Sequence, residues 1–179
     1  KTIFIGGMGL QIIDISDPED PLILSSFSIS KGSNQLIFKS LIVSPDETKL
    51  FISDIEYLEI IDISDLKSPA MIARVQDPAS VRSTDDYKLT GLCKPNLLIS
   101  NDAKFLFVAG FGLQIFDISK LTTPNLISSV HSRADDKSRS NPASIALSQD
   151  GKTLYYTDGS FWVYNVEVPR DITVISCFN

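Results

Sequence analysis

Histidine and cysteine are scarce in this chain of 179 residues, which contains one His and two Cys. Sites built from clusters of His or Cys, such as structural zinc sites, are therefore nearly excluded. Uninterrupted apolar runs reach only about five residues, whereas a membrane-spanning helix needs about 20. The net charge of −6 argues against a nucleic-acid partner, because duplex binding requires a concentrated basic surface.

The remaining composition is that of a folded protein, with 43% hydrophobic and 21% charged residues. The chain begins at Lys1, with no initiator Met and no signal-like segment. We therefore expect a fragment or a processed product of a longer protein.

A repeat without gaps accounts for most of the sequence. Three copies of its core read Leu-(Gln or Glu)-Ile-(Ile or Phe)-Asp-Ile-Ser, and in each of them a Pro follows five residues after the Ser. A second motif, Ser-x-Asp followed by a short apolar segment, precedes three of the cores. The cores begin at Leu10, Leu58, Leu113 and, in a weaker form, Phe161, and the second motif begins at Ser44, Ser100 and Ser148.

The apolar segments of each repeat are typical of β-strands, because they are short, rich in Ile, Val, Leu and aromatic residues, and bounded by Asp, Gly, Pro and Ser. The two middle segments carry apolar residues on both faces, as strands do when both sides of their sheet are covered. Four antiparallel strands in a unit of roughly 40 to 50 residues predict a β-propeller blade. In the second repeat the predicted strands are Leu41–Ser44, Leu50–Ser53, Tyr57–Ile63 and Ala70–Val75.

The sequence thus predicts an all-β chain with three full blades of four antiparallel strands and one blade that lacks its innermost strand. The expected boundaries are about 1–28 for the partial blade and then 41–76, 97–131 and 144–178. The last strand, Ile172–Cys177, is already the fourth of its own blade, so no strand is available to close a ring. We expect part of a six- to eight-bladed propeller, with a closed four-bladed ring as the alternative.

The segment from Leu10 to Pro21 resembles the LVIVD repeat, in which Gly-Leu-x-Ile-x-Asp-Ile-Ser-x-x-x-x-Pro recurs through β-propellers. Three copies fit the pattern, and the fourth departs from it with Asn165 in place of Asp. The resemblance implies a scaffold for molecular contacts and no reaction common to the family. Because many members are secreted or surface proteins, it also favours an extracellular or cell-surface location.

The repeated aspartates Asp14, Asp62 and Asp117 are interpreted as structural residues of the turn after the third strand. An Asp in this position accepts hydrogen bonds from backbone N–H groups of the turn. The alternative is a ring of carboxylates that binds a cation, but every blade needs its turn, and this favours the structural interpretation. The lone His131 is interpreted as a surface residue rather than a general base, and a Cys93–Cys177 disulfide remains open.

Long connections that differ in sequence, at about 28–40, 77–96 and 132–143, are expected at one end of the wheel, where function usually resides. Our main hypothesis is a non-enzymatic module for protein–protein interaction or assembly, which uses this face or the open blade edges and has no cofactor. Its partner would be another protein, an edge-paired copy or the remaining blades of a longer chain. The candidate interaction residues are Arg82, Asp85, Asp86, Tyr87, Lys88, Lys94, Arg133, Asp135 and Asp136.

The alternative hypothesis is a propeller hydrolase, similar to lactonases, with a metal ion in the central channel. Such a site needs inward-pointing oxygen or nitrogen ligands where the innermost strands begin. The sequence offers Asn34, Asn96 and Asn141 near these positions. Three asparagines without a carboxylate form a weak site for a divalent cation.

Overall fold

The expected all-β propeller fold is confirmed by the structure, which is a computed structural model. It describes residues 1–6, 9–27, 30–31, 34–35, 40–53, 57–76, 96–110, 112–130, 144–157 and 159–178. These residues form one three-stranded and three four-stranded antiparallel sheets, together with one small hairpin. None of the described segments contains a helix that is long and apolar enough to cross a membrane.

The four larger sheets are the blades, numbered here in chain order, and each follows the order of its strands in the sequence. Blade 1 consists of β1 (Thr2–Gly6), β2 (Leu10–Asp14) and β3 (Leu22–Phe27). Blade 2 consists of β6 (Ser40–Val43), β7 (Lys49–Ser53), β8 (Tyr57–Asp62) and β9 (Ala70–Gln76). Blade 3 consists of β10 (Asn96–Ile99), β11 (Phe105–Gly110), β12 (Gly112–Asp117) and β13 (Asn125–Val130), and blade 4 of β14 (Ser144–Leu147), β15 (Thr153–Thr157), β16 (Phe161–Asn165) and β17 (Thr173–Phe178).

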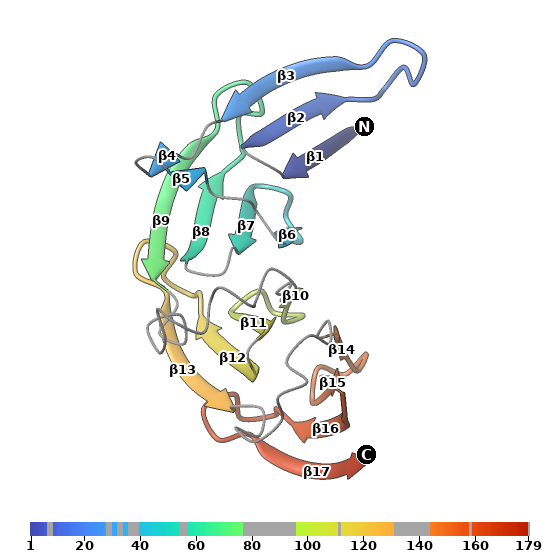
Figure 1. Cartoon of the computed structure of the whole chain (residues 1–179), viewed down its shortest axis with the longest axis vertical. Coiled ribbons are helices and arrows are strands. Elements are labelled where there is room, and N and C mark those ends of the chain that lie inside the picture. Colours follow the sequence, from blue (N-terminus) through green and yellow to red (C-terminus); the bar gives the residue numbers. More distant parts are fainter. Residues whose placement is uncertain are drawn as a thin grey trace.

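The blades follow one another along an open arc (Figure 1). The innermost strands β6, β10 and β14 lie on the concave side of the arc, and the outer strands β3, β9, β13 and β17 form its convex rim. The innermost strands of successive blades are neighbours, since β10 contacts both β6 and β14. The arc therefore forms part of the wall of a central channel.

The observed strands differ in detail from those predicted above, and several bounds shift by one residue. A two-stranded hairpin, β4 (Ser30–Lys31) with β5 (Asn34–Gln35), lies within the first long connection. The innermost strand of blade 2 is Ser40–Val43 rather than Leu41–Ser44, because the ladder to β7 starts with the pair Ser40 and Ser53. Polar residues that flank an apolar segment pair as readily as the segment itself, so residue type alone does not mark the end of a ladder.

The hydrophobic core lies between the blades, in three seams. Blades 1 and 2 meet over an aliphatic cluster that includes Leu10, Ile52 and Ile61. Alternate residues of a strand supply opposite seams, because successive side chains point to opposite faces of a sheet. Leu50 packs towards blade 1, and its neighbour Phe51 packs towards blade 3.

Candidate functional site

The two ends of the wheel are defined by the strand register of the blades. In blade 2, Ser40 pairs with Ser53 at one end, which we call the loop face because the long connections between blades join there. At the opposite end, which we call the turn face, Val43 pairs with Leu50, and Asp62 pairs with Ala70. The turns within a blade, between its first and second and its third and fourth strands, lie on the turn face.

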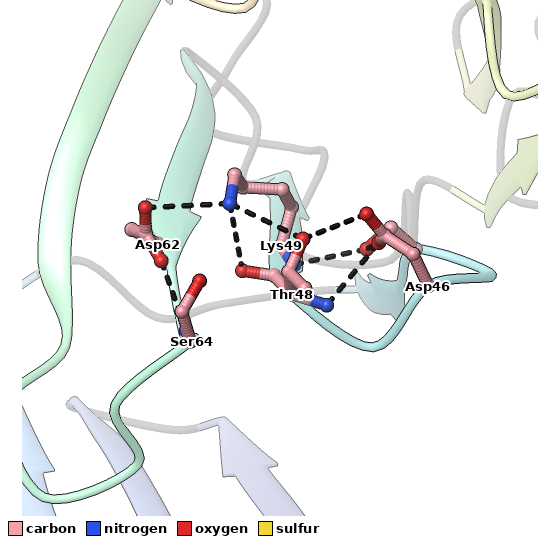
Figure 2. A network of polar contacts seen from close by, with 6 residues as sticks. Asp46, Thr48, Lys49, Asp62 and Ser64 are labelled. Carbon is pink, nitrogen blue, oxygen red and sulfur yellow. Dashed lines mark hydrogen bonds and ion pairs between the residues drawn. The ribbon is translucent and has the colours of Figure 1, made fainter.

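The turn face carries a repeated network of hydrogen bonds, shown for blade 2 in Figure 2. Asp46 accepts hydrogen bonds from the Ser44 hydroxyl at 2.5 Å, the Thr48 hydroxyl at 2.8 Å and the Thr48 backbone N–H at 3.2 Å. The Lys49 ammonium lies 3.3 Å from Asp62 Oδ2 and connects the two turns of the blade (Figure 2). These contacts, led by the Ser44 hydroxyl, lower the pKa of Asp46 to about 2.

The bond between the Ser hydroxyl and the Asp carboxylate recurs in the next two blades. The hydroxyls of Ser100 and Ser148 donate to Asp102 at 2.7 Å and to Asp150 at 2.6 Å, and in both blades this bond is the main cause that lowers the pKa of the carboxyl group. The lowered pKa values of these aspartates therefore arise from hydrogen bonds within the turns that connect the strands.

The aspartates at the ends of the third strands accept hydrogen bonds within their own turns. Asp14, Asp62 and Asp117 each accept the backbone N–H of the Ser two residues later, at 2.8, 2.9 and 3.0 Å. Asn165 does the same in blade 4, where it accepts the N–H of Glu167 at 2.9 Å. Among the described residues there is no group of three or more His, Cys, Asp or Glu side chains that could hold a metal ion.

At the loop face, by contrast, each innermost strand begins with a neutral polar residue. The innermost strands begin there with Ser40, Asn96 and Ser144, the residues four positions before the Ser-x-Asp motifs. Their partners across the ladder are Ser53, Ala109 and Thr157. Because neighbouring innermost strands are in contact, Ser40, Asn96 and Ser144 follow one another at the loop-face ends of these strands, and we call these three residues the polar arc.

The polar arc differs from the asparagine set expected from the sequence. Only Asn96 begins an innermost strand; Asn34 lies in the β4–β5 hairpin, where its side chain is not described, and Asn141 lies outside the described residues. Ser40 and Ser144 were missed, although the constant spacing to the Ser-x-Asp motif contains the signal for them. With no carboxylate or imidazole in the arc, its donor set does not fit a resident divalent cation.

The other candidate residues fall mostly outside the described part of the chain. This holds for His131 and Cys93 and for the whole proposed interaction set of the long connections. That set is Arg82, Asp85, Asp86, Tyr87, Lys88, Lys94, Arg133, Asp135 and Asp136. Cys177, the described cysteine, is exposed on β17.

A buried ion pair near the loop face was not anticipated from the sequence. Glu59 on β8 is 1% exposed and lies 3.3 Å from Arg74 Nε on β9, its neighbour across the ladder. The Arg74 guanidinium also stacks over the Tyr57 ring, 4.1 Å from its centroid. The pair joins the outer strands of blade 2.

Comparison with solved structures identifies proteins with the same fold as this chain. A protein from Lactobacillus plantarum superposes with a TM-score of 0.73 at 15% identity, over 98% of this chain and 53% of its own. The periplasmic gluconolactonase of Pseudomonas aeruginosa gives 0.73 at 14% identity, and a putative 6-phosphogluconolactonase of Bacteroides fragilis gives 0.67 at 15%, each over 99% of this chain. This chain spans only about half of these proteins, 53% and 54% of the last two.

These neighbours contradict the expectation of a non-enzymatic interaction scaffold, since the arc of blades is shared with propellers that are named as lactonases. The expectation relied on the scarcity of His, Cys and carboxylate residues near the channel. That count overlooked neutral polar residues, and Ser40, Asn96 and Ser144 begin the innermost strands of blades 2, 3 and 4.

A search of the curated proteins finds no match to this sequence. The family comparison is positive: the LVIVD repeat matches residues 3–28, 49–77 and 99–132. Each match covers the strands of one blade beyond the innermost, from β1 to β3, from β7 to β9 and from β11 to β13. The resemblance inferred from the sequence is thereby confirmed, and the chain belongs to the LVIVD-repeat β-propellers.

Proposed function

We propose that this chain contributes four blades to a propeller enzyme of the lactonase type, whose site lies at the loop-face mouth of the channel. The observation that supports the proposal most strongly is the superposition of almost the whole arc on the gluconolactonase and 6-phosphogluconolactonase propellers. The chemistry of the polar arc is compatible with it, because a sugar lactone presents several neutral hydroxyls and one ester carbonyl.

In this proposal the arc binds and orients the lactone. The Asn96 amide both donates and accepts, and the hydroxyls of Ser40 and Ser144 do so as well, so each of them can pair with a sugar hydroxyl. Lactone hydrolysis adds water to the carbonyl carbon, breaks the bond to the ring oxygen and places a proton on that oxygen. Holding the ring still relative to the attacking water is a large part of such catalysis.

The test is hydrolysis of glucono-1,5-lactone by the complete polypeptide, followed as acid release with the spontaneous rate subtracted. Asn96→Ala is expected to raise KM by about tenfold, since two hydrogen bonds to the substrate are lost. Lys104→Ala on the turn face of the same blade is the matched control and should leave KM unchanged.

A rate no higher than the spontaneous one, with the protein folded by circular dichroism, overturns the lactonase proposal. Hydrolysis that Asn96→Ala and Ser144→Ala leave unaltered overturns the assignment of the polar arc as its binding site.

A further inference from the structure

The turn between β14 and β15 of blade 4 contains an aspartate followed by a glycine, Asp150 and Gly151. In such a pair the backbone nitrogen of the Gly can attack the side-chain carboxyl group of the Asp, because a residue without a Cβ atom leaves the approach unhindered. Asp150 is exposed, so water has access to its carboxyl group. The sequence contains one further Asp-Gly pair, Asp158 and Gly159, of which Asp158 lies outside the described residues.

Both reacting groups are held by hydrogen bonds in the folded turn. Asp150 Oδ1 accepts the Ser148 hydroxyl at 2.6 Å and the Lys152 backbone N–H at 3.1 Å. The Gly151 N–H donates to the Ser148 carbonyl at 2.9 Å. Attack requires the nitrogen to lose its proton and the carboxyl group to be protonated, because water is a far better leaving group than hydroxide. The hydrogen bonds oppose both changes, and the Ser148 hydroxyl is the main cause that lowers the pKa of Asp150.

Blade 3 contains the same turn without the reactive pair. Asp102 accepts the Ser100 hydroxyl at 2.7 Å and the Lys104 backbone N–H at 3.2 Å. Ala103, at the position of Gly151, also has a positive φ angle and donates its N–H to the Ser100 carbonyl at 2.9 Å. Its methyl group hinders attack by its own backbone nitrogen, so blade 3 is an internal comparison with the same hydrogen bonds and no glycine.

We propose that Asp150 is a site of spontaneous conversion to isoaspartate and that the closed turn of blade 4 restrains this reaction. The Gly151 nitrogen bonds to Asp150 Cγ, a Cγ–O bond breaks, and the oxygen leaves as water with the proton of the carboxyl group and that of the nitrogen. Water then adds to one carbonyl of the cyclic imide and breaks its bond to the nitrogen, which regains a proton. Opening at the main-chain carbonyl leaves the chain running through the former side chain. This proposal is independent of the lactonase proposal.

The conversion disrupts a turn that also contacts the neighbouring blade. Isoaspartate adds one carbon atom to the main chain and replaces the side-chain carboxylate that the Ser148 hydroxyl binds in the folded turn. In the same turn, the Gln149 carbonyl accepts the Asn101 side-chain amide of blade 3 at 2.9 Å. We therefore expect the modified chain to have a weakened contact between blades 3 and 4.

The test is incubation of the complete polypeptide, folded and unfolded in urea, followed by peptide mapping with mass spectrometry. Trypsin cleaves after Lys152, so the two Asp-Gly pairs fall in different peptides. Isoaspartate at position 150 is expected to form slowly in the folded chain and several times faster in the unfolded chain. Ser148→Ala, folded by circular dichroism, should form it several times faster than the folded wild type.

Two changes in blade 3 are the matched controls. Ser100→Ala should leave the rate at Asp150 unchanged, and Ala103→Gly should make Asp102 reactive in the unfolded chain, where wild-type Asp102 remains unchanged. Equal rates at Asp150 in the folded and unfolded wild-type chain overturn the restraint by the turn, and this comparison decides even if Ser148→Ala does not fold. A folded Ser148→Ala chain no faster than the wild type, or an equal acceleration by Ser100→Ala, overturns the role of the Ser148 hydroxyl. An unfolded chain without isoaspartate at position 150 overturns the assignment of the site.

Discussion

One residue in the turn between the first and second strands of blades 2, 3 and 4 adopts a left-handed backbone conformation. The φ angles are 57° at Glu47, 56° at Ala103 and 74° at Gly151, and each residue donates its N–H to the Ser carbonyl three positions earlier at 2.9 Å. Only Gly adopts this conformation without steric cost, so blades 2 and 3 carry a local strain that blade 4 avoids.

We predict that Ala103→Gly stabilises the protein by about 0.5 to 1 kcal/mol, since the relieved strain exceeds the added entropy of the unfolded chain. The reverse change, Gly151→Ala, should destabilise it by about 1 to 2 kcal/mol. Its new Cβ would also lie 3.3 Å from Asn101 Nδ2, which donates to the Gln149 carbonyl across the seam. Urea unfolding of both variants measures the change in the free energy of unfolding. Changes of the same sign in the two variants would contradict the explanation by backbone strain.

Acid should weaken the turn of blade 2 through Asp46. Its pKa of about 2 in the folded protein is below the ordinary value of 3.8, so the unfolded chain binds the proton more readily. The stabilisation is fully present only well above the ordinary pKa of 3.8 and is lost as the pH falls through the folded pKa of about 2. Ser44→Ala removes the main cause of the shift, so we predict that the pKa of Asp46 rises towards 3.8 in a carboxyl NMR titration; an unchanged pKa would count against the Ser44 hydrogen bond.

For single residues, recurrence of the same residue from blade to blade determined what could be predicted from the sequence. The turn aspartates were assigned from the sequence because a residue that recurs at the same turn of successive blades indicates a role in that turn. The left-handed residues could not be predicted, because Glu47 and Ala103 carry no glycine signal and the hydrogen bonds of the turn impose the conformation. Ser40 and Ser144 were missed because serine at the start of a strand is unremarkable until the register brings it to the channel mouth.

Between the third and fourth strands, one cross-strand pair changes character from blade to blade. Blade 2 has the charged pair Glu59 and Arg74, whereas blade 3 has Gln114 opposite Ser129. Blade 1 has Gln11 opposite Ser26, and blade 4 has Trp162 opposite Cys177. A buried charge is tolerated in blade 2 because its partner lies directly opposite.

We predict that Glu59→Gln alone destabilises the protein by about 3 kcal/mol, because it leaves Arg74 without its carboxylate in a largely buried position. Adding Arg74→Ser recreates the neutral pair of blade 3 and should restore most of the loss. A double-mutant cycle by urea unfolding measures the coupling. Additive changes in the free energy of unfolding would contradict a coupling between Glu59 and Arg74. Lys67→Ala, at an exposed position in the turn between β8 and β9, serves as the control.

The strands themselves were predictable, since both faces are apolar and the repeat fixes their order. One feature of every blade could not be predicted from the sequence. The ladder between the last two strands of the blade shifts register by one residue, after Ile12, Ile60, Ile115 and Val163. Such a bulge increases strand twist. A sequence pattern with a period of two residues does not reveal it, because apolar residues occupy both faces of these strands.

At the scale of the whole molecule, stability resides in the seams, because each blade buries its apolar residues only against its neighbours. The repeat predicted the blades and their order. It also predicted an unclosed part of a wheel. The polar arc required the structure, because it depends on where the ladder of each innermost strand begins.

Burial in the seams leads to a prediction for two residues at the same position of the repeat, one inside a seam and one on an exposed blade face. Phe107 and Tyr155 occupy equivalent sites, but Phe107 is covered by blade 4 and is 1% exposed, whereas Tyr155 is 38% exposed on the outer face of blade 4. Phe107→Ala should destabilise the chain by about 3 to 5 kcal/mol, because it opens a cavity inside a seam. Tyr155→Ala should cost less than about 1 kcal/mol, because its side chain is not enclosed by a second blade. Urea unfolding of both variants measures the two losses, and equal losses would show that stability does not reside in the seams.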